Sequence, residues 1–213
     1  MKKIIYLSGI DGAGKTSVSK EIYKHYYAKK IKAYYTWGGL TPVLLKPLSL
    51  VAKLLFVRKL DKNNNYSIHK KHKQKSINKF KYLMSLQFII ALADYYPQYL
   101  FKVYFRSKLN EIIIIDRYYL DFFIERGILA NWTLEQTYNK IIDYQRLFLN
   151  PTDFIYLKIN PEIALKRKDD IPSIDYLNDR ERYYNYIHAR LNSFVIDGGK
   201  SLDEVVEDIR NIL

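Results

Sequence analysis

The sequence predicts an α/β fold in which one parallel β-sheet is covered by helices on both faces. Its 213 residues, 48% of them hydrophobic, are enough for one sizeable core and too few for two full domains. Short apolar runs without polar alternation indicate strands that are buried on both faces, and helical patterns lie between these runs. This alternation is typical of parallel strands joined by right-handed crossovers. We therefore expect a single domain over residues 1–213.

The expected strands are short runs rich in Ile, Val, Tyr or Phe. They are Lys3–Leu7, Lys32–Thr36, Ile112–Ile115, Phe154–Ile159 and Phe194–Ile196.

Three helices have clear sequence signals. Asn160 and Pro161 form an N-cap and a first-turn proline, which predict a helix to about Lys168. Ser201-Leu202-Asp203-Glu204 is a capping-box pattern that predicts the last helix, ending at Leu213. The segment Ile77–Lys108 is expected to be a long helix, with Pro97 bending or breaking it.

The region from about 42 to 81 reads as a helical and basic insert. Its apolar part, Leu44–Val57, is expected to be a helix that packs within the chain, forms a dimer interface or covers the substrate. Its basic part, Arg58–Lys81, carries nine Lys or Arg residues and a single acid, and it contributes to the net charge of +13. Basic grooves that hold nucleic acid interleave charges with stacking aromatic residues, which are sparse here. Nucleic acid is therefore not the expected partner, and binding of nucleic acid by the basic stretch is kept as an alternative.

Composition narrows the class of protein further. The chain has no cysteine, which excludes disulfides and thiolate chemistry and fits a reducing compartment. The longest apolar stretches fall short of the roughly 18 residues that a membrane-spanning helix needs. We therefore expect a cytoplasmic protein without a membrane span.

A phosphate-binding motif follows the first expected strand and precedes a helical run. The residues from Gly9 to Thr16 read G-I-D-G-A-G-K-T and match the pattern G-x-x-x-x-G-K-[ST] in full. Backbone N–H groups of such a loop surround a phosphate, and the helix that follows adds its positive end. Lys15 would reach the β- and γ-phosphates of ATP, and Thr16 would bind Mg²⁺. The expected nucleotide-binding residues here are Gly9, Gly12, Ala13, Gly14, Lys15, Thr16 and Ser17.

The expected strand Ile112–Ile115 ends in Asp116-Arg117. An acid at the end of a buried strand is the second motif expected of a P-loop NTPase, so Asp116 is the expected partner of Thr16 in holding Mg²⁺. The alternative is that Asp116 caps the next helix. Arg117 suits binding of an acceptor phosphate better than activation of water. Motifs typical of guanine-specific GTPases lack their aspartate, which argues against a GTPase switch.

Taken together, these motifs resemble the thymidylate kinase family over most of the chain. The P-loop with its third-position aspartate, Asp116-Arg117-Tyr118, Pro161–Arg167, Tyr176–Tyr183 and Val195–Gly198 each resemble a family segment. The resemblance implies a three-layer P-loop sandwich with five parallel strands in the order 2-3-1-4-5. It also implies a homodimer and a magnesium- and ATP-dependent transferase of nucleotide biosynthesis that converts dTMP to dTDP.

The resemblance also implies roles for individual residues. Asp11 would lie near the acceptor sugar and the metal, and Arg117 would bind the acceptor phosphate. Arg167, Asp197 and Gly198 would lie on the adenine side. A short lid over about 168–180 would supply the catalytic cation, because the P-loop has none; the candidates are Lys166, Arg167, Lys168, Arg180 and Arg182. The implied catalytic set is Lys15, Asp11, Arg117, Arg167 and Arg180.

The acceptor side departs from the family pattern. Trp37-Gly38-Gly39 replaces a basic phosphate-contacting residue, and Ala91 and Tyr95 stand where the family reads thymine. The aromatic residues that could stack a base instead are Phe88, Tyr95 and Tyr96, and Gln87 or Gln98 could read its edge. The alternatives are a kinase of another phosphorylated or hydroxyl acceptor and a nucleotide-dependent module that binds nucleic acid.

Overall fold

The computed structural model describes residues 2–43, 46 and 81–213. Within them, a five-stranded sheet has the order β2-β3-β1-β4-β5, with all neighbouring strands parallel. This confirms the α/β fold and the strand order. Each expected strand agrees with the structure to within one residue at either end. The strands are β1 (Lys3–Ser8), β2 (Ala33–Trp37), β3 (Ile112–Asp116), β4 (Asp153–Lys158) and β5 (Phe194–Asp197).

The register of the central strands brings the two halves of the nucleotide motif together. β1 and β3 are paired inside the sheet, and their apolar residues are buried. Leu7 is paired with Asp116, and Trp37 of β2 is paired with Asp116 from the other side. The loops after β1, β2 and β3 therefore begin at one edge of the sheet, which is where ligands bind in open α/β sheets.

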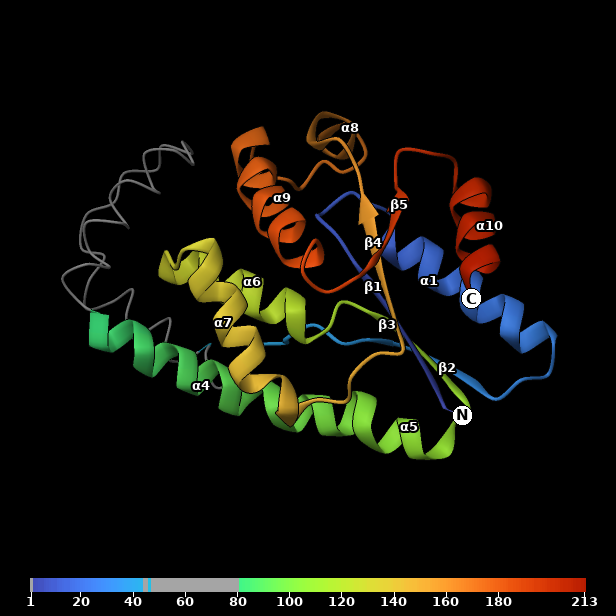
Figure 1. Ribbon diagram of the computed structural model, residues 1–213, viewed down its shortest axis with the longest axis horizontal. Helices are drawn as coiled ribbons and strands as arrows, with labels where there is room; N and C mark the ends of the chain where they lie inside the picture. Colours follow the sequence, from blue (N-terminus) through green and yellow to red (C-terminus); the bar gives the residue numbers. More distant parts are fainter. Residues whose placement is uncertain (1, 44–45, 47–80) are drawn as a thin grey trace.

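Helices cover both faces of the sheet (Figure 1). The helices α1 (Lys15–Ala28) and α10 (Leu202–Ile212) lie together on one side. On the other side lie α4 (Lys81–Tyr99), α5 (Phe105–Leu109), α6 (Tyr119–Ala130), α7 (Leu134–Tyr144) and α9 (Ile174–His188). The short helix α8 (Pro161–Lys166) follows β4 and contacts α9, and a 3-10 turn, η2 (Gln145–Leu147), follows α7.

The long helix continues through Pro97 and is not broken there. Pro97 lies inside α4, and a π-helical turn, η1 (Leu100–Tyr104), follows before the helix continues as α5. Proline has no N–H to donate to the preceding turn, so Pro97 removes one helical hydrogen bond without interrupting the helix. The basic stretch at 58–80 and most of the expected helix at 44–57 lie outside the described residues.

An aromatic cluster fills the space between α4 and the helices α6 and α7. Tyr95 is stacked on Phe122 with ring centroids 4.7 Å apart, and Phe88 packs against Trp132 at 5.2 Å. Such pairs stabilise beyond the burial of their area. The same cluster includes Tyr99, Tyr118, Tyr119, Phe123, Tyr144 and Phe148.

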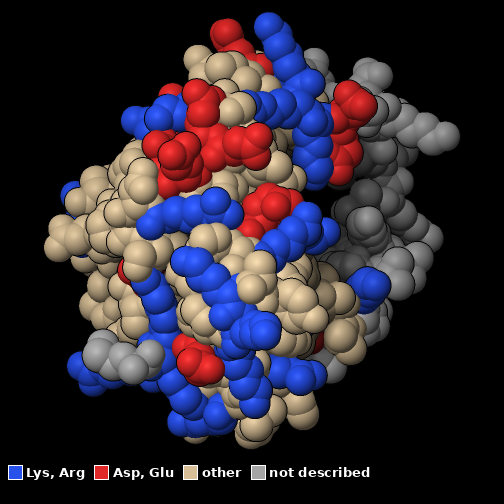
Figure 2. All heavy atoms as spheres, turned by 90° about the vertical axis from the view of Figure 1, so that its right-hand side faces the viewer, with Lys and Arg blue, Asp and Glu red and all other residues tan. Residues whose placement is uncertain are grey.

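The surface that carries α1 and α10 has mixed charge. Figure 2 shows Lys and Arg side chains across its middle and lower parts, with acidic side chains interspersed and most numerous toward its top. Within the described part of the chain, no helix combines the length and the apolar character needed to span a bilayer.

Candidate active site

The P-loop is shaped by backbone conformations that favour glycine. Gly12 has φ +84°, and a Cβ at this position would lie 2.5 Å from the carbonyl oxygen of Ala164. Gly14, also left-handed, is the N-cap of α1, which begins at Lys15. The first-turn N–H groups of α1 are therefore turned toward the loop, as in sites that bind phosphate at helix N-termini.

Lys15 is a buried cation inside this loop. Its Nζ donates hydrogen bonds to the carbonyl oxygens of Gly9 at 2.8 Å and Ile10 at 2.6 Å. Burial, together with the nearby charge of Arg117, lowers the pKa of Lys15 to about 8. The ammonium group is thus held by neutral oxygens, and an anion entering the loop would be a stronger partner.

Thr16 and Asp116 form a pair of oxygen ligands. The Thr16 hydroxyl donates to Asp116 Oδ2 at 2.5 Å, while Asp116 Oδ1 is buried and has no hydrogen-bond partner within the described residues. Burial raises the pKa of Asp116, which is a sign that its charge lacks full compensation. Oxygen ligands with a free buried carboxylate atom suit a hard divalent cation such as Mg²⁺. Asp116 does not cap the next helix; Asp121 does, by accepting from Tyr118 N at 2.8 Å.

Arg117 and Asp11 form an ion pair across the mouth of the loop. Nη2 of Arg117 donates to Asp11 Oδ1, and the Tyr176 hydroxyl donates to the other carboxylate oxygen at 3.0 Å. Burial opposes ionisation of Asp11, but the charges of Arg117 and Lys15 and these hydrogen bonds outweigh it and lower its pKa to about 2. Arg117 has φ +62°, a strained conformation for a residue other than glycine.

A cavity of about 460 Å³ gathers most of the predicted residues. Arg167 lies on its rim, donating to the carbonyl oxygens of Gly198 at 2.6 Å and Gly199 at 3.0 Å, so the loop after β5 borders the same site. Asp197 accepts from Gly199 N at 2.8 Å and shapes that loop. The cavity is lined by Asp11, Gly12, Gly14, Lys15, Thr16, Ser17, Arg117, Arg167 and Lys168.

Arg180 lies apart from this cavity, in a bidentate ion pair with Glu125 of α6 at 2.7 and 2.8 Å. Lys168 lines the cavity and also pairs with Asp170 at 3.0 Å, where both side chains are exposed. Sequence reasoning missed Tyr176, Glu125 and Tyr35, whose hydroxyl lies 3.5 Å from Asp116 Oδ2. Glu125 and Tyr35 belong to no local motif, and Tyr176 was noted only as the first residue of the family-like segment Tyr176–Tyr183, without a role of its own.

Three of the five side chains that the sequence suggested for reading the acceptor base are engaged within the chain. Phe88 and Tyr95 are buried in the aromatic cluster, and the Tyr95 hydroxyl donates to Gly38 O at 2.9 Å. Gln98 fastens the loop after β2, accepting from Thr41 N at 3.0 Å and donating to Thr41 O at 2.8 Å. The expectation that Phe88 or Tyr95 could stack a base is therefore wrong for this structure, because both rings pack inside the protein.

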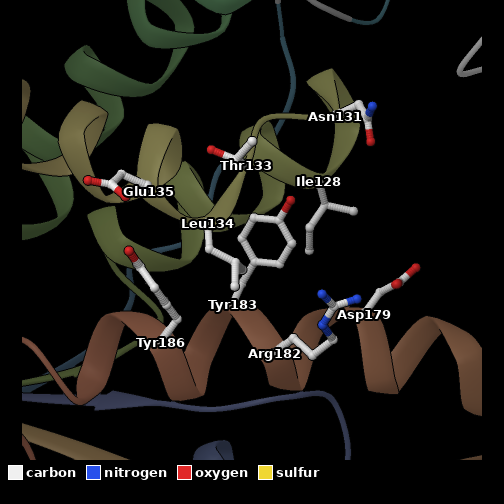
Figure 3. Close-up of a pocket in the computed structure, with 9 residues that line it drawn as sticks. All are labelled: Ile128, Asn131, Thr133, Leu134, Glu135, Asp179, Arg182, Tyr183 and Tyr186. Atoms are coloured by element: carbon white, nitrogen blue, oxygen red, sulfur yellow. The ribbon is translucent and has the colours of Figure 1, made fainter.

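A larger cavity, of about 680 Å³, lies between α9 and the α6–α7 turn (Figure 3). Arg182, Tyr183 and Tyr186 line it from α9, facing Thr133 and Glu135 of the turn and of α7. No residue of the P-loop lines this larger cavity, whereas the P-loop lines the smaller one. The larger cavity volume therefore does not identify the active site. The lid-edge residue Arg182 belongs to this second cavity.

Comparisons with known proteins bear on the family resemblance. No protein-family model matches the chain. The chain is 23% identical to "Probable thymidylate kinase" of Staphylothermus marinus, over 98% of this chain and 93% of the relative. It is 25% identical to "Putative kinase protein 143R" of Invertebrate iridescent virus 6, over 99% of this chain and 96% of the relative. These distant, full-length relatives confirm the resemblance to thymidylate kinase-like P-loop proteins and suggest nucleotide kinase activity.

Proposed function

We propose that this thymidylate kinase-like P-loop protein transfers the γ-phosphoryl group of Mg-ATP to the phosphate of a nucleoside monophosphate, with dTMP as the leading acceptor. The observation that carries the proposal is one cavity lined by Lys15, Thr16 and Arg117, in which Thr16 is hydrogen-bonded to the buried Asp116. A buried ammonium, an oxygen pair suited to Mg²⁺ and a guanidinium beside them are what phosphoryl transfer needs.

Each of these residues has a distinct part in the proposal. The P-loop N–H groups and Lys15 hold the β- and γ-phosphates, while Thr16 and Asp116 hold Mg²⁺, which neutralises charge on the phosphates when bound. Arg117 exchanges Asp11 for the acceptor phosphate and orients it. Arg167 and Lys168, which line the cavity, are the best candidates for the lid cation. Catalysis then rests on positioning and charge, with no covalent intermediate.

The acceptor is the less constrained half of the proposal. Because Phe88, Tyr95 and Gln98 are engaged within the chain, thymine would be read differently from the family pattern. This favours keeping, as a second candidate, a kinase of another phosphorylated or hydroxyl acceptor. A module that binds nucleic acid has less support, since the face in Figure 2 mixes both signs of charge.

We further propose a cytoplasmic homodimer, in which exposed apolar side chains along the long helix contribute to the dimer interface. These side chains are well exposed, from 49% for Phe105 to 70% for Phe101. They are Leu86, Ile89, Phe101, Phe105 and Leu109. Exposed apolar surface of this extent is typical of interaction sites. Sedimentation of the purified chain as a monomer at micromolar concentration would reject the dimer.

The decisive experiment is product formation from Mg-ATP and a panel of dTMP, dUMP, UMP, CMP, AMP and GMP. We expect selective formation of one diphosphate, and a fall of at least about 100-fold in Lys15→Ala, which removes a cation aimed at developing charge. Circular dichroism should show that Lys15→Ala remains folded. Equal turnover in Lys15→Ala would sink the kinase proposal, and turnover of none of the panel would direct attention to other acceptors.

A further inference from the structure

A chain of contacts connects helix α6 to the P-loop aspartate through helix α9. Both carboxylate oxygens of Glu125 accept from Nη2 of Arg180, and Nη1 donates to the backbone carbonyl of Tyr176 at 3.4 Å. The Arg180 guanidinium lies 3.4 Å from the centroid of the Tyr176 ring. The Tyr176 hydroxyl in turn donates to Asp11 Oδ2 at 3.0 Å. The side chain of Arg180 is only 9% exposed, so these contacts are shielded from solvent on the side of the arginine.

We infer that Glu125, Arg180 and Tyr176 are positioning residues that hold Asp11 in place. The importance of this positioning for catalysis rests on the proposed function, in which Asp11 lies beside the acceptor. This assignment also gives Arg180 a role different from the catalytic one implied by the family resemblance. A guanidinium that is engaged by Glu125 and stacked on a ring is poorly placed to reach a transferring phosphoryl group.

The need for such a support follows from the Asp11–Arg117 ion pair. In the proposed reaction, Arg117 turns its guanidinium to the acceptor phosphate, and Asp11 then loses its main partner. Tyr176 stays as a hydrogen-bond donor, since burial raises the pKa of its hydroxyl and keeps it protonated. The positive charge of Arg180 beside the ring fixes its orientation. Asp11 thereby remains fixed while Arg117 is engaged elsewhere.

Tyr176→Phe tests this inference, because it removes one hydroxyl and keeps the ring under Arg180. The matched control is Tyr183→Phe, two turns along the same helix, whose hydroxyl donates to the backbone carbonyl of Trp132 outside the phosphate cavity. A hydrogen bond to a charged group corresponds to an effect of about 10- to 100-fold. We expect Tyr176→Phe to raise the acceptor KM by at least about 10-fold while the ATP KM stays within about twofold, and Tyr183→Phe to change neither.

A second measurement does not depend on activity. With ¹³C-carboxyl-labelled aspartate and Asp11→Asn to assign the signal, we expect Tyr176→Phe to shift the Asp11 resonance and raise its pKa. Glu125→Gln should act in the same direction through Arg180 and Tyr176, and Tyr183→Phe should have no effect.

An unshifted Asp11 resonance in Tyr176→Phe or Glu125→Gln would overturn the inference. So would a shifted resonance with an unchanged acceptor KM, or an ATP KM that rises in parallel with that of the acceptor. If the wild-type protein phosphorylates no acceptor while Tyr176→Phe and Glu125→Gln both shift the Asp11 resonance, the proposed function is refuted and the positioning of Asp11 is supported.

Discussion

The proposed donor and acceptor sides of the site are built in different ways. On the donor side, Gly9 to Thr16 form a continuous loop whose backbone and Lys15 do the binding, supported by one acid from the neighbouring strand. On the acceptor side, Gly38, Tyr95 and Phe122 come from three separate elements and are joined by packing. A contiguous loop can keep its shape when residues in other elements are replaced, whereas a surface formed by packed side chains changes when any of those side chains is replaced. We therefore expect sequence changes to alter the proposed acceptor preference more easily than the binding of ATP.

Replacing Phe122 by alanine should give the largest effect, a loss of stability, and it tests whether the two sides of the site are independent. Phe122 is 4% exposed and is stacked on Tyr95, so its loss should lower the free energy of unfolding by about 3–5 kcal/mol. Affinity for ATP should stay within about twofold, because the P-loop backbone is unaffected. Urea unfolding and calorimetric titration measure the two quantities.

The control for this change is Tyr27→Ala, since Tyr27 is 69% exposed on α1 and its truncation should alter stability by less than about 1 kcal/mol. If Phe122→Ala instead weakened ATP binding 10-fold or more, the two sides would be coupled and the comparison would fail.

A smaller effect is expected from the protonation of Lys15. With a pKa of about 8 in the free protein, this amine is partly neutral at pH 8.5. Bound phosphates favour the charged form and raise the pKa, so ATP binding at pH 8.5 should take up protons, and affinity should fall as the pH rises above about 8. Calorimetric titrations in two buffers with different heats of ionisation measure the uptake.

Lys15→Arg provides the control for that measurement, because guanidinium does not titrate in this range. Equal proton uptake in both proteins would show that another group is responsible.

Local signals made the fold and the donor side predictable. Each strand was marked by a short apolar run and the P-loop by eight consecutive residues, and the observed order of strands agrees with the family resemblance. Capping patterns at Ser201 and Asn160 marked helix starts that the structure shares. Of the two effects expected of Pro97, the break is absent, because the helix continues through it into a π-helical turn.

The sequence by itself determined what depends on neighbouring residues: the strands, the caps and the loop in which glycines and Lys15 adopt a phosphate-binding shape. Only the tertiary structure decided which distant side chains meet. Tyr176 and Asp11 are 165 residues apart, and Arg180 and Glu125 are 55 apart, so no local pattern announces their pairing. The contact between Arg180 and Glu125 forms because α6 and α9 pack against each other, which fixes where their side chains point. Tyr95 is likewise enclosed by a distant element, since its ring stacks on Phe122 of α6.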